Sequence, residues 1–340
     1  MSGRINWISI AQDMSQFRKD PFSDRWVIFA EGRERRPNEY EQTAGRRRDA
    51  RCPFCVGHEV DTPPAIHTYR SNGQRDDEWL VRVVPNMYPA LVPRGTAEPS
   101  ANGLYQTCAA VGAHEVIVET PRHVASFTEL TDAEARCLLL AYRDRILVHG
   151  RAGHLKYALV FKNVGPAAGA SLEHAHSQVV ATPMIPPELQ RELTAAERLY
   201  KAHGQCFFCR VIADELTHAT RLVAQSDRFV AICPYASRMP YELWVLPREH
   251  SSKFESQDPT ALAELADFLR LNLGKLESRH RQFAYNYFIH TGPFDTPHLN
   301  HYHWHIEVFP RLTTTAGLEW GAGYFINPVL PEHAAAIMRS

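Results

Sequence analysis

The chain of 340 residues is 44% hydrophobic, enough to bury a substantial core, and it exceeds the size at which one core usually divides into two. Its 37 basic and 38 acidic residues leave a net charge near zero, without the basic tail or stripe typical of nucleic-acid binding. We therefore expect two lobes and no nucleic-acid partner, and a few placed side chains must hold any bound anion.

The sequence contains no sign of a membrane span or an export route. No apolar run approaches the roughly 20 residues of a transmembrane helix, and the N-terminal segment lacks an apolar stretch followed by a small-residue cleavage site. We expect a cytoplasmic protein with no membrane contact. Its seven cysteines are an odd number, which argues for reduced thiols, some of them metal ligands, and against a disulfide framework.

The first half of the chain opens with a CxxC pair at 52–55 and continues to a strand-like segment, HEVIVETPRH, over residues 114–123. A helix is predicted next, because Thr131 and Glu134 form a capping box and Gly150 ends the apolar periodicity. A β run with the sequence YALVFKN follows this helix, and the segment HAHSQ closes the half.

The second half presents the same elements in the same order. A CxxC pair lies at 206–209, and the segment YELWVLPREH covers residues 241–250. Asp258 and Pro259 begin a predicted helix, which precedes the β run YNYFIH and the segment HWHIE. The leucines on one face of that helix are Leu262, Leu265, Leu269, Leu273 and Leu276.

This agreement indicates an internal repeat. Both strand-like segments have ten residues, with glutamate second and histidine last, and the histidine pair starts 51 residues after His123 and 53 residues after His250. The pattern predicts an α+β protein made of two fused units, each a mostly antiparallel sheet with a packed helix. We place the catalytic unit at residues 1–195 and the second unit at residues 196–340.

The repeated cysteines and histidines are typical zinc ligands. Structural zinc takes four nitrogen or sulfur ligands in a tetrahedron, and a CxxC turn supplies two thiolates to one side of it. Since the protein fills all four positions, neither ion keeps an open site for an activated water. We expect two structural zinc ions per chain, the first bound by Cys52, Cys55, His123 and His174, the second by Cys206, Cys209, His250 and His303.

Other interpretations of these residues remain open at this point. A single CxxC is also typical of a redox pair or of coincidence, and free cysteines and core histidines are often simply buried. The other cysteines, Cys108, Cys137 and Cys233, fit that simpler description.

The two histidines of HAHSQ have different predicted roles. If His174 points to the metal, its neighbour Ala175 points the other way, and His176 shares the face of His174 one pleat further along. A neutral imidazole is a capable nucleophile toward phosphorus when a backbone carbonyl polarises its other nitrogen. We therefore predict His176 as the group that attacks substrate.

Polar groups beside this motif suit a phosphate. Gln178, two residues after His176, is placed to form hydrogen bonds with phosphate oxygens, and the small-residue loop NVGPAAGAS, residues 163–171, ends in the hydroxyl of Ser171. We predict that the loop amides and Ser171 line an anion site.

These motifs together resemble the galactose-1-phosphate uridylyltransferase family, a branch of the histidine triad superfamily with two fused units. The resemblance covers nearly the whole chain, and it extends to the related ADP-glucose phosphorylase. HAHSQ resembles the family motif His-Pro-His-x-Gln, which implies that His176 takes a nucleoside monophosphate and that His174 binds zinc. It also implies a homodimer with active sites near the interface.

The resemblance also assigns substrate-binding residues. The segment DPFSDRWVIFAEGRERRP implies that Arg33 and Arg36 contact the phosphates and the bound sugar, although RERRP is also readable as an ordinary solvated basic run. The segment VVPNMYPAL supplies Asn86, and FKNVGPAAGAS supplies Asn163 and Gly169 beside Ser171.

Three departures from the family pattern bear on function. Ala175 replaces the usual proline of the motif, and the second CxxC is missing from some members, which have a different second metal site in this lobe. The C-terminal stretch AGLEWGAGYFINPVLPEHAA resembles both uridylyltransferases and the phosphorylase. The resemblance therefore leaves the base and the acceptor open.

The favoured function is transfer of a nucleoside monophosphate, first of all UMP, between sugar 1-phosphates through a covalent nucleotidyl-histidine, which places the chain in galactose metabolism. In this scheme Gln178 and Ser171 stabilise the phosphoryl oxygens. One alternative keeps the intermediate but uses inorganic phosphate as acceptor, as an ADP-sugar or dinucleoside polyphosphate phosphorylase. The other is a non-catalytic zinc protein that binds nucleotides. His305, which corresponds to His176, is assigned to structure or a subunit contact.

Overall fold

The computed structural model describes residues 15–340 except 32, 34–50, 71–77 and 280–282. Its centre is one ten-stranded sheet in which each pair of neighbouring strands is antiparallel. In spatial order the strands are β10 (Leu222–Gln225), β11 (Phe229–Ile232), β12 (Leu243–Pro247), β14 (His305–Pro310), β13 (Tyr285–His290), β8 (Tyr157–Val164), β9 (His176–Thr182), β7 (Ala113–Val118), β4 (Val81–Pro85) and β3 (His67–Tyr69).

The order of the strands confirms the predicted repeat. From the central pair β8 and β13, the sheet continues outward through β9, β7, β4 and β3 on one side and through β14, β12, β11 and β10 on the other. In the chain, β7 leads through helix α1 (Asp132–Gly150) to β8 and β9, and β12 leads through α4 (Pro259–Arg279) to β13 and β14. The two units are thus fused into one sheet, and the boundary predicted after residue 195 falls within α2 (Pro187–His203).

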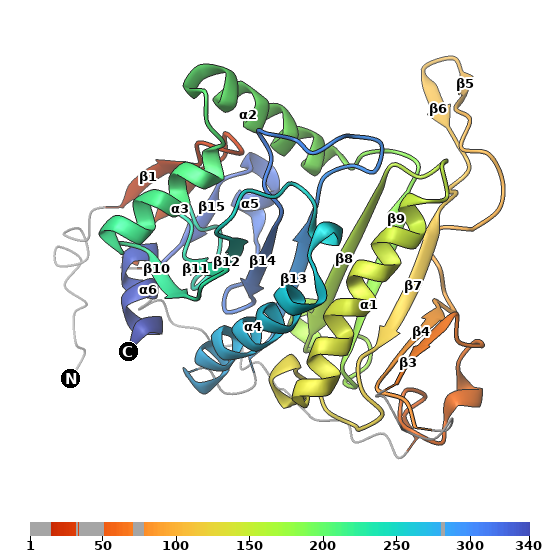
Figure 1. Cartoon of the computed structure of the whole chain (residues 1–340). Helices are drawn as coiled ribbons and strands as arrows, with labels where there is room; N and C mark the ends of the chain where they lie inside the picture. Colours follow the sequence, from red (N-terminus) through yellow and green to blue (C-terminus); the bar gives the residue numbers. More distant parts are fainter. Residues whose placement is uncertain (1–14, 32, 34–50, 71–77, 280–282) are drawn as a thin grey trace, which may run out of the picture.

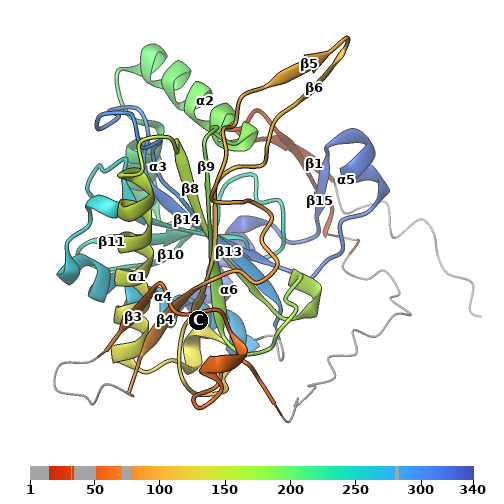
Figure 2. The same cartoon turned by 90° about the vertical axis from the view of Figure 1, so that its right-hand side faces the viewer.

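The remaining elements surround this sheet. Two further helices are α3 (Phe207–His218) and α6 (Pro331–Arg339), with the short α5 (Gly317–Ala322) between β14 and β15. A three-stranded sheet contains β1 (Gln16–Lys19), β2 (Trp26–Phe29) and β15 (Phe325–Asn327), and β5 (Ser100–Asn102) with β6 (Tyr105–Thr107) forms a projecting hairpin (Figure 2). Within the described ranges, 3-10 turns include η3 (Glu59–Asp61), η4 (Phe127–Glu129), η5 (Pro166–Ala168) and η6 (Phe254–Ser256).

The helices α1 and α4 lie side by side on one face of the sheet, here called the helix face (Figure 1). The predicted capping box begins α1: Glu134 N donates to Thr131 Oγ1 at 3.3 Å, and Thr131 N donates to Glu134 Oε2 at 2.8 Å. The carboxylate of Asp258 caps α4 by accepting from Ala261 N at 2.9 Å. The five predicted leucines of α4 are all buried against the sheet.

The opposite face of the sheet has a separate core in its second half, where α2 and α3 pack. Phe208 and Ile212 of α3 lie with Val230 of β11 and Trp244 of β12 in this cluster. In the first half, the same face holds the loop that carries the first CxxC pair, whose Cys52 and Phe54 pack on Val84, Val116 and Val118. The helix face therefore stabilises the fold, and the opposite face carries the cysteine-containing segments.

The structure corrects one detail of the predicted repeat. Gln178 pairs with Val116, whereas Glu307, its counterpart, pairs with Trp244, so the ten-residue segments are offset by one residue. A shift of one residue in a strand exchanges the faces. Glu115 consequently faces the helices and binds Arg145, with 2.7 Å between Arg145 Nε and Glu115 Oε2, while its sequence counterpart Glu242 accepts from Trp244 Nε1 on the opposite face.

A buried ion pair lies on the helix face, directly behind the HAHSQ strand. Lys162 Nζ donates to the carboxylate of Glu119, and both side chains are fully buried. The hydroxyl of Tyr142 lies 3.4 Å from Glu119 Oε1, 2.9 Å from Ser177 Oγ and 2.6 Å from the hydroxyl of Tyr287. This network ties α1 to three neighbouring strands.

Lys162→Met should lower the free energy of unfolding by about 3 to 5 kcal/mol, because it leaves the Glu119 charge buried without a partner. Denaturant unfolding of the variant measures this loss. The double variant Lys162→Met/Glu119→Gln should recover a large part of it, since no buried charge remains. If Lys162→Met is as stable as the wild type, the ion pair contributes little to the free energy of unfolding.

Candidate active site and metal centres

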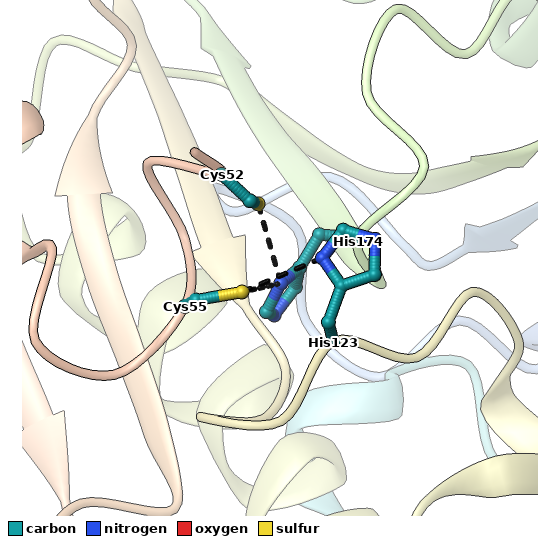
Figure 3. Close-up of side chains that lie close together, drawn as sticks. All are labelled: Cys52, Cys55, His123 and His174. Atoms are coloured by element: carbon teal, nitrogen blue, oxygen red, sulfur yellow. Dashed lines mark hydrogen bonds between the residues drawn. The ribbon is translucent and has the colours of Figure 1, made fainter. Parts of the chain in front are cut away.

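Figure 3 shows four side chains converging from three separated segments. Cys52 and Cys55 lie on the loop before η3, His123 follows β7, and His174 precedes β9. Cys55 Sγ lies 3.4 Å from His123 Nδ1 and 3.5 Å from His174 Nδ1, and Cys52 Sγ lies 3.5 Å from His174 Nδ1. The sequence-predicted ligand set is therefore brought together.

The orientation of His174 suits a metal ligand. Its Nε2 lies 2.8 Å from the carbonyl oxygen of Thr120 and donates to it, so Nδ1 faces the sulfurs. Burial lowers the pKa of His174 to about 4, which keeps the ring neutral. Zinc bonded to sulfur and nitrogen at its usual lengths separates its ligand atoms by about 3.3 to 3.8 Å, which matches the distances found here.

The second cluster repeats this geometry. Cys206 and Cys209 lie at the start of α3, and Cys209 Sγ is 3.3 Å from His250 Nδ1 and 3.7 Å from His303 Nδ1. His250 Nε2 lies 3.1 Å from Leu299 O, and His303 Nε2 lies 2.9 Å from Pro247 O. Both four-residue clusters could hold a metal ion, since the ligand atoms within each lie within 4.8 Å of one another.

A third group was not found from the sequence. Glu192 of α2, His290 of β13 and His305 of β14 also present ligand atoms within 4.8 Å of one another. Glu192 Oε2 lies 2.7 Å from His290 Nδ1 and accepts from the hydroxyl of Tyr302 at 3.2 Å. The histidine pair HWH marked one member, but a glutamate in the connecting helix gave no signal of its own.

His176 is the first residue of β9, and its ring is held in one tautomer. Nδ1 lies 2.8 Å from His174 O, an acceptor, so Nδ1 carries the proton and Nε2 keeps its lone pair. The ring of Phe54 lies 5.4 Å from that of His176, and only 8% of the residue is exposed. Burial lowers the pKa of His176, which favours the neutral ring that a nucleophile requires.

Two carboxamides flank His176 on the same face. The register that pairs Lys162 with Ser177 places Asn163 of β8 opposite His176, and Gln178 is the next residue of β9 on that face. Asn86, just after β4, reaches this group, with Nδ2 3.4 Å from Gln178 Oε1. The predicted residues Asn86, Asn163, His176 and Gln178 thus lie together.

The predicted anion loop connects β8 to β9. Gly169 adopts a φ of +83°, the left-handed conformation that favours glycine, and both Gly169 and Ser171 are exposed. Their backbone and hydroxyl groups are therefore available at the same end of the strands as His176.

Of the two predicted arginines, the structure describes Arg33. Arg33 is exposed and follows β2, whose Val27 and Phe29 pack on Ala236 in the second unit. The strand that it follows belongs to the three-stranded sheet, which is separate from the ten-stranded sheet that contains β9 and His176. Arg36 lies outside the described residues.

Besides Glu192, sequence reasoning missed His114, and it was wrong about the burial of Cys108. His114, at the head of the ten-residue segment, contacts Gln178 through its ring, with 2.7 Å between His114 Nε2 and Gln178 Oε1. Cys108, expected to be a buried thiol, is exposed because it follows the projecting hairpin of β5 and β6; Cys233 is buried as expected, and Cys137 is half-buried.

None of the helices in the described ranges combines the length and the apolar character that spanning a membrane demands.

Comparison of the sequence with models of known protein families identifies the class of protein. Residues 215–311 match the HIT domain, and residues 8–186 match the N-terminal domain of galactose-1-phosphate uridyl transferase. Together with the strand order and the two histidine motifs, these matches define a histidine triad protein with two fused units. The chain belongs to the galactose-1-phosphate uridylyltransferase family.

Individual relatives cover almost the full chain. An ADP-glucose phosphorylase from Arabidopsis thaliana is 32% identical over 97% of this chain and 94% of its own length. A galactose-1-phosphate uridylyltransferase from Thermotoga maritima is 28% identical over 96% of this chain and 98% of its own. The crystal structure of the Arabidopsis enzyme with bound ADP-glucose superimposes with a TM-score of 0.83, covering 96% of this chain and 98% of that one.

Proposed function

We propose that this chain transfers a nucleoside monophosphate from a nucleotide-sugar through a covalent intermediate on His176. His176 Nε2 attacks the α-phosphorus, an N–P bond forms, and the P–O bond to the departing sugar 1-phosphate breaks. An oxygen of the acceptor then attacks the same phosphorus and releases the histidine. The observation that carries this proposal is the His176 ring, whose Nδ1 is bonded to His174 O at 2.8 Å and whose Nε2 keeps a lone pair.

Two acceptors fit this scheme. The greater similarity to the Arabidopsis ADP-glucose phosphorylase, 32% against 28% for the Thermotoga uridylyltransferase, favours phosphate as acceptor and AMP as the transferred group. This reaction is our first candidate, in place of the UMP transfer that the sequence had put first. Transfer of UMP between sugar 1-phosphates is the second candidate.

The residues around His176 are assigned roles in this reaction. We propose that Gln178, Ser171, Asn163 and the loop at Gly169 hold the phosphoryl oxygens, with Asn86 beside them. We also propose a homodimer in which Arg33 and Arg36 of one copy serve the outer phosphate at the site of the other. The position of Arg33, just after a strand of the separate three-stranded sheet, supports this arrangement.

We propose zinc as the ion of both cysteine and histidine clusters, in a structural role. The two-sulfur, two-nitrogen ligand sets support this choice, because zinc is the usual partner of such sets. Zinc would hold the CxxC segment of each unit against the strand that carries its histidine pair. Thiolate ligands also fit a reducing, cytoplasmic compartment.

Metal analysis of the purified protein should return about two zinc ions per chain. Cys206→Ser should remove one of them and lower the thermal midpoint by more than about 5 °C, since a metal that binds only the folded chain stabilises it. Transfer rates measured below the new midpoint should change little, because this cluster lies in the second unit. A large loss of rate at unchanged midpoint would contradict a structural role.

Wild-type protein incubated with ADP-glucose alone should gain the mass of one adenylyl group, which is AMP less one water, on a bond that survives alkali and breaks in acid. His176→Gly should form no adduct but keep its zinc and its fold, since His176 is not a metal ligand. His174→Ala is the matched control and should lose metal and stability together. An adduct on any residue other than His176 would refute the proposal.

The same preparation identifies base and acceptor. UDP-glucose should label the protein more slowly than ADP-glucose, and phosphate should discharge the adduct faster than galactose 1-phosphate. The reverse order in both measurements would establish the second candidate.

A further inference from the structure

The carboxamide of Gln178 has a fixed direction, because a backbone donor decides the tautomer of its neighbour. Ala90 N donates to His114 Nδ1 at 3.0 Å, so this nitrogen is an acceptor and the ring proton is on Nε2. His114 Nε2 therefore donates to Gln178 Oε1 at 2.7 Å. The oxygen of Gln178 faces His114, and its amino group faces away.

A second backbone donor supports the same direction. Tyr88 N donates to Asn86 Oδ1 at 2.8 Å, which turns the amino end of Asn86 toward Gln178. Asn86 Nδ2 lies 3.4 Å from Gln178 Oε1 and 3.1 Å from His114 Nε2. Since His114 Nε2 already carries a proton, the available acceptor for Asn86 is the oxygen of Gln178.

Asn163 is oriented independently on the other side of His176. Asn286 Nδ2 donates to Ala168 O at 2.8 Å and to Asn163 Oδ1 at 2.7 Å, while Arg311 Nε donates to Asn286 Oδ1 at 2.5 Å. A carbonyl only accepts and a guanidinium only donates, so both ends of Asn286 are determined. The oxygen of Asn163 is engaged by Asn286, and its amino group is left to donate.

We propose that His114 and Asn286 are positioning residues, which turn the carboxamides of Gln178 and Asn163 so that N–H groups face the transferred phosphoryl group. The assignment rests on the proposed function, and neither residue touches the substrate. A carboxamide that is free to rotate presents its oxygen part of the time, and that oxygen repels the phosphoryl oxygens. Donors fixed in advance need no reorganisation when charge develops on those oxygens.

His114→Gln and His114→Glu form a matched pair that separates donation from shape. Glutamine retains a donor for Gln178 Oε1, whereas glutamate only accepts and binds the amino group of Gln178, which turns the oxygen toward the phosphate. The single-turnover rate of adduct formation should fall roughly a hundredfold in His114→Glu relative to His114→Gln. Zinc content and thermal midpoint of the two variants should agree.

The control is the same pair in a Gln178→Ala background, where no carboxamide remains to be turned and the two variants should react at equal rates. A further loss from glutamate in that background would show that its charge acts directly, and would overturn the assignment. Equal rates for the pair in the wild-type background would overturn it as well. A wild type that forms no adduct from either nucleotide-sugar refutes the proposed function itself.

Asn286→Asp tests the second arm. Aspartate cannot donate to Ala168 O or to Asn163 Oδ1, so Asn163 should turn its amino group toward position 286 and slow adduct formation roughly tenfold or more. In an Asn163→Ala background the substitution should have no further effect. A wild-type rate for Asn286→Asp, or an equal loss in both backgrounds, would overturn the role of Asn286.

Discussion

The hydrogen bonding of β8 to β13 joins the two repeats into one sheet. The register of this sheet determines which side chains lie next to His176. Because side chains alternate between faces, the register of each neighbouring pair decides which groups meet. Across the three central strands β9, β8 and β13, His176 lies beside Asn163, and Asn163 pairs with Asn286. The helix face, buried under α1 and α4, holds that register in place, with the Lys162 and Glu119 pair behind the motif.

In both units, backbone carbonyls orient the two histidines of the pair in the same way, but the surroundings of the second histidine differ. In both, the first histidine of the pair donates from Nε2 to a carbonyl and turns Nδ1 to the sulfurs, and the second donates from Nδ1 to the carbonyl of the first. In the second unit, however, the ring centres of Phe208 and His305 lie 4.9 Å apart. The exposed fraction of His305 is 0%, compared with 8% for His176. Glu307 replaces the glutamine and binds Arg238 at 2.7 Å.

This difference supports the proposal that the first unit carries the chemistry and the second unit serves structure. An accepting carboxylate at Glu307 stands where Gln178 offers a donor, so a phosphate beside His305 would meet repulsion where one beside His176 meets N–H groups. Phe208 of α3 fills the space above His305, and the analogous contact in the first unit, Phe54 on His176, comes from a loop. Under the proposed function, the repeat therefore supplies two similar scaffolds and one reactive centre, at His176.

Local patterns predicted much of this arrangement. Capping residues, leucine periodicity and the spacing of cysteines and histidines reflect contacts within short segments or strong ligand chemistry. They predicted α1, α4 and the two cysteine and histidine clusters that could hold a metal ion. The offset that separates Glu115 from Glu242 lies in strand register, which depends on the whole sheet. Arg33 depends on how a separate sheet packs, and Glu192 on the path of a connecting helix, so neither position follows from local sequence.

The orientation of a side-chain carboxamide is harder to predict from the sequence than its position in the fold. Glutamine at 178 is compatible with a donor or an acceptor toward phosphate, and HAHSQ is the same in either case. What decides is a backbone N–H at Ala90, in a loop 88 residues earlier, acting through the ring of His114. No sequence motif marks the role of His114. That role depends on the pairing of β7 with β9 and β4, which brings its ring between Gln178 and Ala90. Sequence identifies the groups that can meet a phosphoryl oxygen, whereas the fold decides which atom each of them presents.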